Sequence, residues 1–269
     1  MLVSVLMAVL PRATASAAVL MVAAATSGAA VLMVAAATTS AAAQEPPTAA
    51  FVRQVIDGEV LATDAGEVRL AGIMTPTQPP ALANQVLAAL RNISIGRTVT
   101  LAYETTAQDR HGRYLAHVET RAGVWLQGTL IDRGLARVAT TPGRRARAAE
   151  MLTRERAARE AGRGLWGDPN YRILSDADAA AHIGAFQLVE GRVLAVQRVK
   201  GVTYLNFGAD YRTDFTLQVP RESLPQFRAA DMLLPDLKDQ RVRVRGWLRQ
   251  FNGPLIDATH PEQIEVLGE

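Results

Sequence analysis

Val55–Thr77, with the sequence VIDGEVLATDAGEVRLAGIMTPT, is the stretch that decides the predicted fold. It reads as a strand, a tight turn at 64–66 and a second strand over 67–73, because aliphatic and β-branched residues flank an Asp-Ala-Gly turn. The second strand ends before Thr75, which a proline follows, since proline has no N–H to donate to a strand ladder. Arg69 lies inside that strand, where its side chain either is half-exposed or enters a cleft.

A second arginine, Arg113, follows a His-Gly turn in the segment DRHGRYL, residues 109–115. This turn is placed to aim Arg113 at the same region as Arg69. The planar fork of a guanidinium matches the oxygens of a phosphate group. The sequence therefore predicts that Arg69 and Arg113 converge on one pocket that suits a phosphodiester.

The segments around these arginines complete a small β domain with helices. Gly134 closes the predicted helix over 124–132 as a C-cap. The predicted helix over 144–160 carries favourable i,i+4 pairs at Glu150–Arg154 and Glu155–Arg159. Such an arginine-rich helix is either a nucleic-acid contact or a solvated face. The predicted strands are 51–56, 59–63, 67–73, 98–103 and 114–119, and the predicted helices are 81–92, 124–132 and 144–160.

The second half has the element order of an OB-fold, a small β-barrel that commonly binds oligonucleotides. Alternation in RVRVRGW puts Arg241, Arg243 and Arg245 on one face, with Trp247 on the same side and the two valines toward the core. This face predicts nucleic-acid binding, and an ordinary solvated strand is the alternative. The predicted strands are 186–197, 202–207, 214–219, 240–249, 254–258 and 264–267, with a helix over 222–230.

Composition sets the broad class of the protein. The chain has 269 residues, of which 49% are apolar and 20% charged, as in ordinary globular proteins. The net charge of +3 is too small to predict a polyanionic partner by itself. The absence of cysteine excludes a disulfide, a thiolate metal site and a thiol nucleophile.

The N-terminal segment predicts a targeting function rather than a folded domain. Residues 1–43 carry one charge, Arg12, and end in three alanines, as a secretory signal peptide does. Export to the periplasm or the medium is therefore expected. An uncleaved inner-membrane anchor is the alternative, because the apolar run reaches the ~20 residues that span a bilayer. The predicted parts are 1–43 (signal or anchor), 44–50 (linker), 51–168 (first domain), 169–185 (linker) and 186–269 (second β domain).

The order of segments over 51–168 resembles the thermonuclease, or staphylococcal-nuclease-like, family. The resemblance rests on IDGE, VRLAGIMTPT, TVTLAYE, DRHGRYLAHV, VWLQGTLIDRGLARV and a charged helix that ends in GLW. It implies a five-stranded OB-type barrel with packed helices, and active members that cut DNA and RNA with one calcium ion. The predicted fold class is thus mainly β with helices, built as two OB-type five-stranded barrels.

The resemblance assigns the phosphate-binding arginines to Arg69 and Arg113, and a calcium-binding backbone carbonyl to Thr75. Glu59 stands where the family has its first metal aspartate, and Met74 where it has the second. Calcium takes about 6–8 oxygen ligands, and the thioether of Met74 supplies none. The sequence thus predicts a degraded calcium site, with calcium as the cofactor only if the protein is active.

The family's water-positioning glutamate is also missing, because Thr77 occupies its place. Three nearby carboxylates, Asp57, Glu67 and Asp109, either replace it or are ordinary turn and strand-edge residues. His111, next to the second arginine, either acts as a base near neutral pH or is an exposed turn histidine.

Two functions from different classes follow from these residues. The first is an exported module that binds nucleic acid or another phosphorylated ligand, with nuclease activity weak or lost. The second is an active metal-dependent phosphodiesterase with a rearranged metal site. Without a general base, which typically contributes ~10²–10⁴-fold, the retained arginines predict residual activity at best. No protein partner is inferred.

Overall fold

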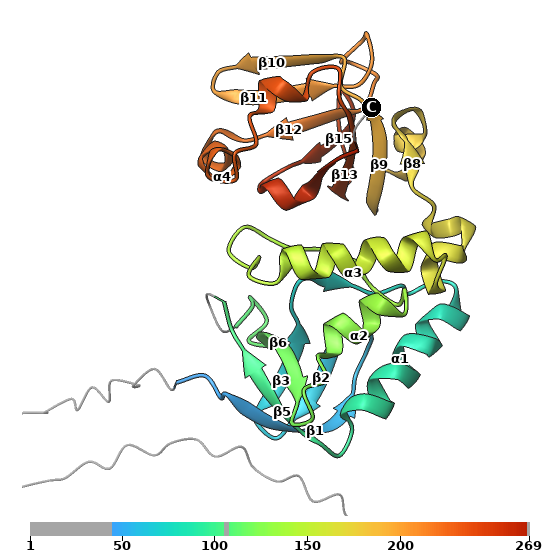
Figure 1. The fold of residues 1–269 in the computed structure, drawn as a ribbon, viewed down its shortest axis with the longest axis vertical. Coiled ribbons are helices and arrows are strands. Elements are labelled where there is room, and N and C mark those ends of the chain that lie inside the picture. Colours follow the sequence, from blue (N-terminus) through green and yellow to red (C-terminus); the bar gives the residue numbers. More distant parts are fainter. Residues whose placement is uncertain (1–44, 105–107, 268–269) are drawn as a thin grey trace, which may run out of the picture. The chain divides into compact units, whose positions relative to one another are not determined.

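The structure is a computed structural model that describes residues 45–104 and 108–267 (Figure 1). The predicted signal or anchor segment, residues 1–43, lies outside the described residues. Within the described ranges, no helix has both the length and the apolar character needed to cross a bilayer.

The first half closes into the five-stranded barrel that the family resemblance implies (Figure 1). The strand order is β1-β2-β3-β6-β5, and β1 pairs with β5 to close the barrel. β3 and β6 are parallel, whereas the other neighbours are antiparallel. The strands are β1 (Ala49–Val55), β2 (Val60–Thr63), β3 (Gly66–Leu70), β5 (Thr98–Ala102) and β6 (Tyr114–Thr120).

Three helices accompany the barrel: α1 (Pro80–Ser94), α2 (Leu126–Asp132) and α3 (Ala148–Glu160). α1 begins with proline, whose missing N–H is not needed in the first turn of a helix. Helix residues such as Leu90 and Leu130 join the strand residues in one buried core. This burial of apolar area is the main force that holds helices and barrel together.

Gly134 ends α2 as predicted. Its φ is +66°, a left-handed conformation that glycine adopts without strain, and its N–H donates to the carbonyl of Ile131 at 2.9 Å. α3, in contrast, begins at Ala148 and not at Arg144. The Pro-Gly pair at 142–143 breaks the helical pattern there, which the prediction overlooked.

A short antiparallel ladder joins β4 (Ile73–Met74) to β7 (Arg137–Val138). The predicted strand 67–73 is therefore two strands, because the chain bends at Gly72, where φ is +74°. The N–H of Ala139 donates to the carbonyl of Gly72 at 2.8 Å. This ladder brings residues 139–144 beside the end of β3.

The second half is β-rich, but it is not the closed five-stranded barrel that was predicted. It contains a five-stranded sheet, β10-β11-β12-β15-β14, and a four-stranded sheet, β16-β13-β9-β8. The predicted strand 186–197 is interrupted at 193–194, so that β9 and β10 lie in different sheets. The strands are β8 (Leu174–Ser175), β9 (Phe186–Arg192), β10 (Ala195–Val199), β11 (Val202–Asn206), β12 (Thr216–Val219), β13 (Arg241–Trp247), β14 (Arg249–Phe251), β15 (Gly253–Asp257) and β16 (Ile264–Val266).

The two sheets of the second half enclose a separate hydrophobic core. Leu205, Leu217 and Val244 are fully buried in it, and Phe227 of α4 (Leu224–Ala229) packs against them. Short 3₁₀ helices connect the strands, at Gly164–Gly167, Pro169–Tyr171, Asp176–His182, Arg221–Ser223, Leu234–Leu237 and Pro261–Gln263.

Candidate functional site

Arg69 and Arg113 line the same pocket, which has a volume of about 700 Å³. We call it the arginine pocket and define it by its polar lining residues Arg69, Gln108, Asp109, Arg110, His111, Arg113, Thr141 and Arg144. Four guanidiniums thus surround one hollow that contains a single carboxylate of its own. Such a site favours an anion, since guanidiniums match phosphate oxygens in charge and geometry.

The parallel pairing of β3 and β6 explains why the two arginines meet. Arg69 lies opposite Leu115, and Arg113 comes two residues before Leu115. Because side chains alternate along a strand, residues two apart point to the same side of the sheet. Val68 and Leu70 face the buried core, which leaves Arg69 between them on the outside.

Each of the two arginines already has a carboxylate partner. Glu59 accepts from Nη2 of Arg69 at 2.9 Å, and Asp109 accepts from Nε of Arg113 at 2.9 Å and pairs with its Nη2 at 2.8 Å. A guanidinium has five N–H donors in a fixed fork. Both carboxylates use the Nε–Nη2 edge, so among the described residues the Nη1 group of each arginine has no partner and remains for a ligand.

Asp109 organises the turn before β6. Its Oδ1 accepts from the backbone N–H of His111 at 2.8 Å and of Arg113 at 3.1 Å. Burial alone would raise the pKa of Asp109, but the hydrogen bonds from Arg113 and from these two backbone N–H groups lower it overall. Asp109 is therefore held ionised as a support for the turn, which is a poor state for a general acid.

The donor set beside Thr75 does not fit calcium. Glu59 uses Oε2 on Arg69, and its Oε1 accepts from the backbone N–H of Thr75 at 3.0 Å. Met74 adds a thioether, and Thr77 is exposed and carries no carboxylate. Within the residues that the structure describes, no three histidine or acidic side chains gather where they would hold a metal. Calcium needs several free oxygens, and here the nearest carboxylate is already neutralised.

The carboxylates considered as replacements for the missing glutamate have local structural roles. Asp57 accepts from the backbone N–H of Glu59 at 2.7 Å, as a turn residue does. Glu67 lies exposed on β3. His111 is exposed at the edge of the arginine pocket, where its Nε2 bonds to Nε of Arg110 at 3.0 Å. Its role as a base stays a prediction.

Arg110 and Arg144 also line the pocket, although the sequence did not predict either of them there. Arg110 is adjacent to the predicted turn, but no pattern shows which way it points. Arg144 was placed in a helix, although the preceding Pro142-Gly143 pair signals a turn. In the structure Arg144 closes this turn by a bridge to Thr141, which places both beside the pocket.

The predicted nucleic-acid face on β13 is largely covered. Val242 and Val244 point into the core as the alternation requires. Arg245, however, is only 2% exposed, and Arg243 binds Glu190 and Glu265. Arg241 and Trp247 remain accessible at the two ends of the strand, with 61% and 58% of their surface exposed. β13 therefore does not present an open row of arginines, because acidic residues on neighbouring elements pair with them.

These acidic partners form what we call the interface ion cluster, which joins α3 to the second half. It contains three acids and three arginines: Glu155, Glu190, Glu265, Arg159, Arg243 and Arg245. Nη1 of Arg245 lies 2.7 Å from Oε2 of Glu155, which is fully buried. The predicted Glu155–Arg159 pair is also present, at 3.6 Å. Burial opposes the charge of Arg245, but Glu155 and Glu265 raise its pKa overall.

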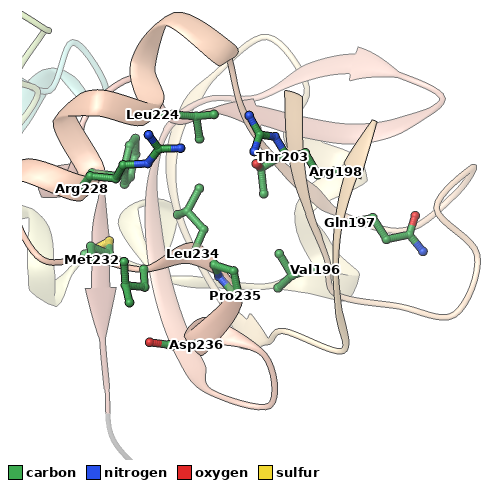
Figure 2. A pocket seen from close by; sticks show the side chains of 12 residues that line it. Val196, Gln197, Arg198, Thr203, Leu224, Arg228, Met232, Leu234, Pro235 and Asp236 are labelled. Carbon is green, nitrogen blue, oxygen red and sulfur yellow. The ribbon is translucent and has the colours of Figure 1, made fainter. Parts of the chain in front are cut away.

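Figure 2 shows another hollow, beside α4 in the second half. Its volume is about 370 Å³, and Val196, Leu224 and Leu234 supply apolar walls. Arg198, Arg228 and Asp236 also line it. The groups that converge in this hollow do not form a catalytic constellation, so it is not the candidate site.

Comparison with known protein families supports the resemblance noted for residues 51–168. Residues 67–168 match the family described as staphylococcal nuclease homologue. No curated protein matches the chain, and the β region after residue 168 lies outside the family match. The match spans all of β3 except its first residue, the arginine pocket and all of α3. Residues 67–168 are therefore a staphylococcal nuclease homologue domain.

Proposed function

We propose that this protein binds nucleic acid, or another phosphodiester ligand, in the arginine pocket, and that its nuclease activity is weak or lost. The observation that carries the proposal is the shared pocket of Arg69 and Arg113, with Arg110 and Arg144 on its walls. The family match adds support, because its members are nuclease homologues by description.

Binding in this pocket is electrostatic in the first place. A phosphodiester oxygen placed between the free Nη1 groups of Arg69 and Arg113 accepts charge-assisted hydrogen bonds from both. The side chains are 37% and 23% exposed, so salt screens part of the attraction. Affinity for DNA should therefore fall as salt concentration rises.

Hydrolysis requires more than this. A phosphodiester is cleaved when a nucleophile is activated and positioned in line, usually by a base or a metal ion. Glu59 is committed to Arg69 and the N–H of Thr75, and Met74 and Thr77 offer no carboxylate. The pocket stabilises the charge of the diester without a group that generates the attacking hydroxide.

The test uses the purified chain with single-stranded DNA, with calcium and with chelator, and scores both binding and cleavage. Salt-dependent binding that Arg69→Ala and Arg113→Ala each weaken, without turnover, is the expected result. Arg53→Ala is a matched control, since Arg53 is exposed on β1 and does not line the arginine pocket. Calcium-dependent turnover that Arg113→Ala abolishes would instead establish the active nuclease, and absence of binding to any nucleic acid would refute both.

We also propose that residues 1–43 direct export, by a cleaved signal peptide or as an inner-membrane anchor. The apolar run and its terminal alanines support this. Fusion of residues 1–50 to a reporter that is active only outside the cytoplasm tests the proposal. An active reporter in the soluble periplasmic fraction indicates cleavage, and one in the membrane fraction indicates an anchor. An inactive reporter refutes export.

A further inference from the structure

The outer face of the five-stranded sheet in the second half carries a second, chemically different pocket. Its volume is about 370 Å³, within the usual range of about 300–1,000 Å³ for small-ligand sites. Its lining comes from strands β10, β11, β12 and β15, from Tyr211 in the loop before β12, and from Phe251 at the end of β14 with Asn252 in the turn that follows. We call it the aromatic pocket.

Strand alternation builds the floor of this pocket. Leu205 and Leu217 point into the core of the second half, so Tyr204 and Thr216 point to the outer face. Antiparallel pairing sets Gln197 opposite Tyr204 and Asn206 opposite Thr216. An aromatic ring and a row of hydrogen-bonding side chains therefore lie on one rigid surface.

The aromatic rings on the walls are unusually open to solvent. Tyr211 is 52% exposed and Phe251 is 54% exposed, and both line the pocket. Exposed aromatic side chains that gather around one hollow mark a binding site more often than scattered ones do. About half of the surface of each of these two residues is therefore accessible to a ligand.

The polar groups of the aromatic pocket are amides and hydroxyls, and no side chain that lines it is ionised. The hydroxyl of Thr216 donates to Oδ1 of Asn206 at 3.3 Å, which leaves the amide nitrogen of Asn206 as a donor. Gln197 and Asn252 add further amide groups. Amide side chains form paired hydrogen bonds with the edges of nucleobases, and aromatic rings stack on their faces.

Cations flank the rings at the rim. The guanidinium of Arg212 lies 5.2 Å from the ring centre of Tyr211, and that of Arg249 lies 5.5 Å from the ring centre of Phe251. Asp257 partly neutralises Arg249 through hydrogen bonds of 2.6 and 3.0 Å. A neutral interior with cations beside the outer rings complements a base inside the pocket and phosphates outside it.

From this geometry we infer that the aromatic pocket binds unpaired nucleobases of single-stranded nucleic acid, as a second contact region separate from the arginine pocket. This inference rests on the proposed function and specifies its substrate class as a single strand. Double-stranded nucleic acid does not fit, because its bases are stacked on each other and cannot offer their faces to Tyr204 or Phe251.

The test compares fluorescently labelled oligo(dT) with an abasic strand of equal length, which has the same phosphates and no bases. Tyr204→Ala and Phe251→Ala should each weaken oligo(dT) binding at least about fivefold, the lower end of a single stacking contact. Neither should change binding of the abasic strand. Arg69→Ala should weaken both strands. Phe51→Ala removes a similarly exposed ring, 41% exposed on β1, and should change neither.

The outcomes separate the two proposals. If both strands bind equally tightly and the aromatic variants change neither affinity, the base site is refuted while the arginine pocket stands. If neither strand binds, both proposals fail. A carbohydrate site would replace the base site under two conditions. The chain would bind a neutral oligosaccharide less tightly as Phe251→Ala, and it would show no preference for oligo(dT) over the abasic strand. Circular dichroism of each exposed-site variant verifies that the fold is intact.

Discussion

Replacing Arg245 by methionine should destabilise the protein more than any other single arginine substitution in the second half. Arg245 is 2% exposed and lies between Glu155 and Glu265, with its Nη1 also 3.2 Å from the carbonyl of Val138. Methionine fills similar space but leaves the carboxylates without this partner. The loss falls mainly on Glu155, because the remaining arginine near it, Arg159, is 3.6 Å away.

The expected magnitude follows from the burial of this pair. Breaking a buried ion pair by removing one partner costs about 3–5 kcal/mol, since a charge stays buried without compensation. That is roughly a hundredfold to several-thousandfold decrease in the folding equilibrium constant. Glu265 contributes less to the loss, because Arg243 at 3.0 Å and Arg159 at 3.2 Å still neutralise it.

The assay is urea unfolding of the full chain, followed by circular dichroism. Arg241→Met is the matched control: this arginine is on the same strand, 61% exposed, and 3.4 Å from Glu190. Its loss should cost at most about 1 kcal/mol, as for other surface pairs. A double variant, Arg245→Met with Glu155→Leu, should recover part of the stability, because it buries no uncompensated carboxylate. Equal costs for Arg245→Met and Arg241→Met would refute the reasoning.

Three further predictions concern other residues. Burial lowers the pKa of His260 to about 4, so the folded state favours the neutral ring. The contribution of His260 to the free energy of unfolding is therefore complete above pH 6.5, and about 3 kcal/mol of it is lost as the pH falls to 4. His260→Gln should remove this pH dependence of the free energy of unfolding. An unchanged profile would contradict this assignment. Met74→Asp with Thr77→Glu should create calcium binding that calorimetry detects, whereas no gain would mean that Glu59 cannot leave its arginine. Gly134→Ala should destabilise the protein more than Gly162→Ala does in urea unfolding. Both glycines have φ near +60°, but only a Cβ at Gly134 would meet a backbone carbonyl. Equal losses of stability would contradict this steric role.

The strands of the first half and the outward direction of Arg69 were predictable from local signals, and the family resemblance implied the barrel. The Asp-Ala-Gly turn at 64–66 and the alternation around Arg69 fix the strand and the outward direction of its side chain. Both arginines then belong to the same face because β3 and β6 are neighbours, and the family resemblance supplied that neighbour relation. The carboxylate partners were not predictable in the same way, since the Glu59–Arg69 pair depends on the side-chain conformation that each residue adopts.

The arginine face of β13 shows that the alternation of residues along a strand does not predict what covers each face. Alternation correctly separates Val244 from Arg243, but it does not reveal what faces the polar side. That side is covered by Glu190 on β9 and by Glu265 on β16, which are 53 and 22 residues away from Arg243 in the chain. A strand with arginines at every second position thus becomes part of an internal contact, because its neighbours supply matching acids.

The second half also contributes to the arginine pocket, although none of its residues lines it. Thr140, between the pocket residues 139 and 141, bonds to Nε2 of His260 at 2.8 Å. Arg145, next to Arg144, donates to Glu262 at 2.9 Å. Both anchors belong to the short segment around the 3₁₀ helix Pro261–Gln263. The wall that carries Arg144 is therefore fixed from outside the nuclease-like domain, because His260 and Glu262 hold the residues on either side of the pocket segment.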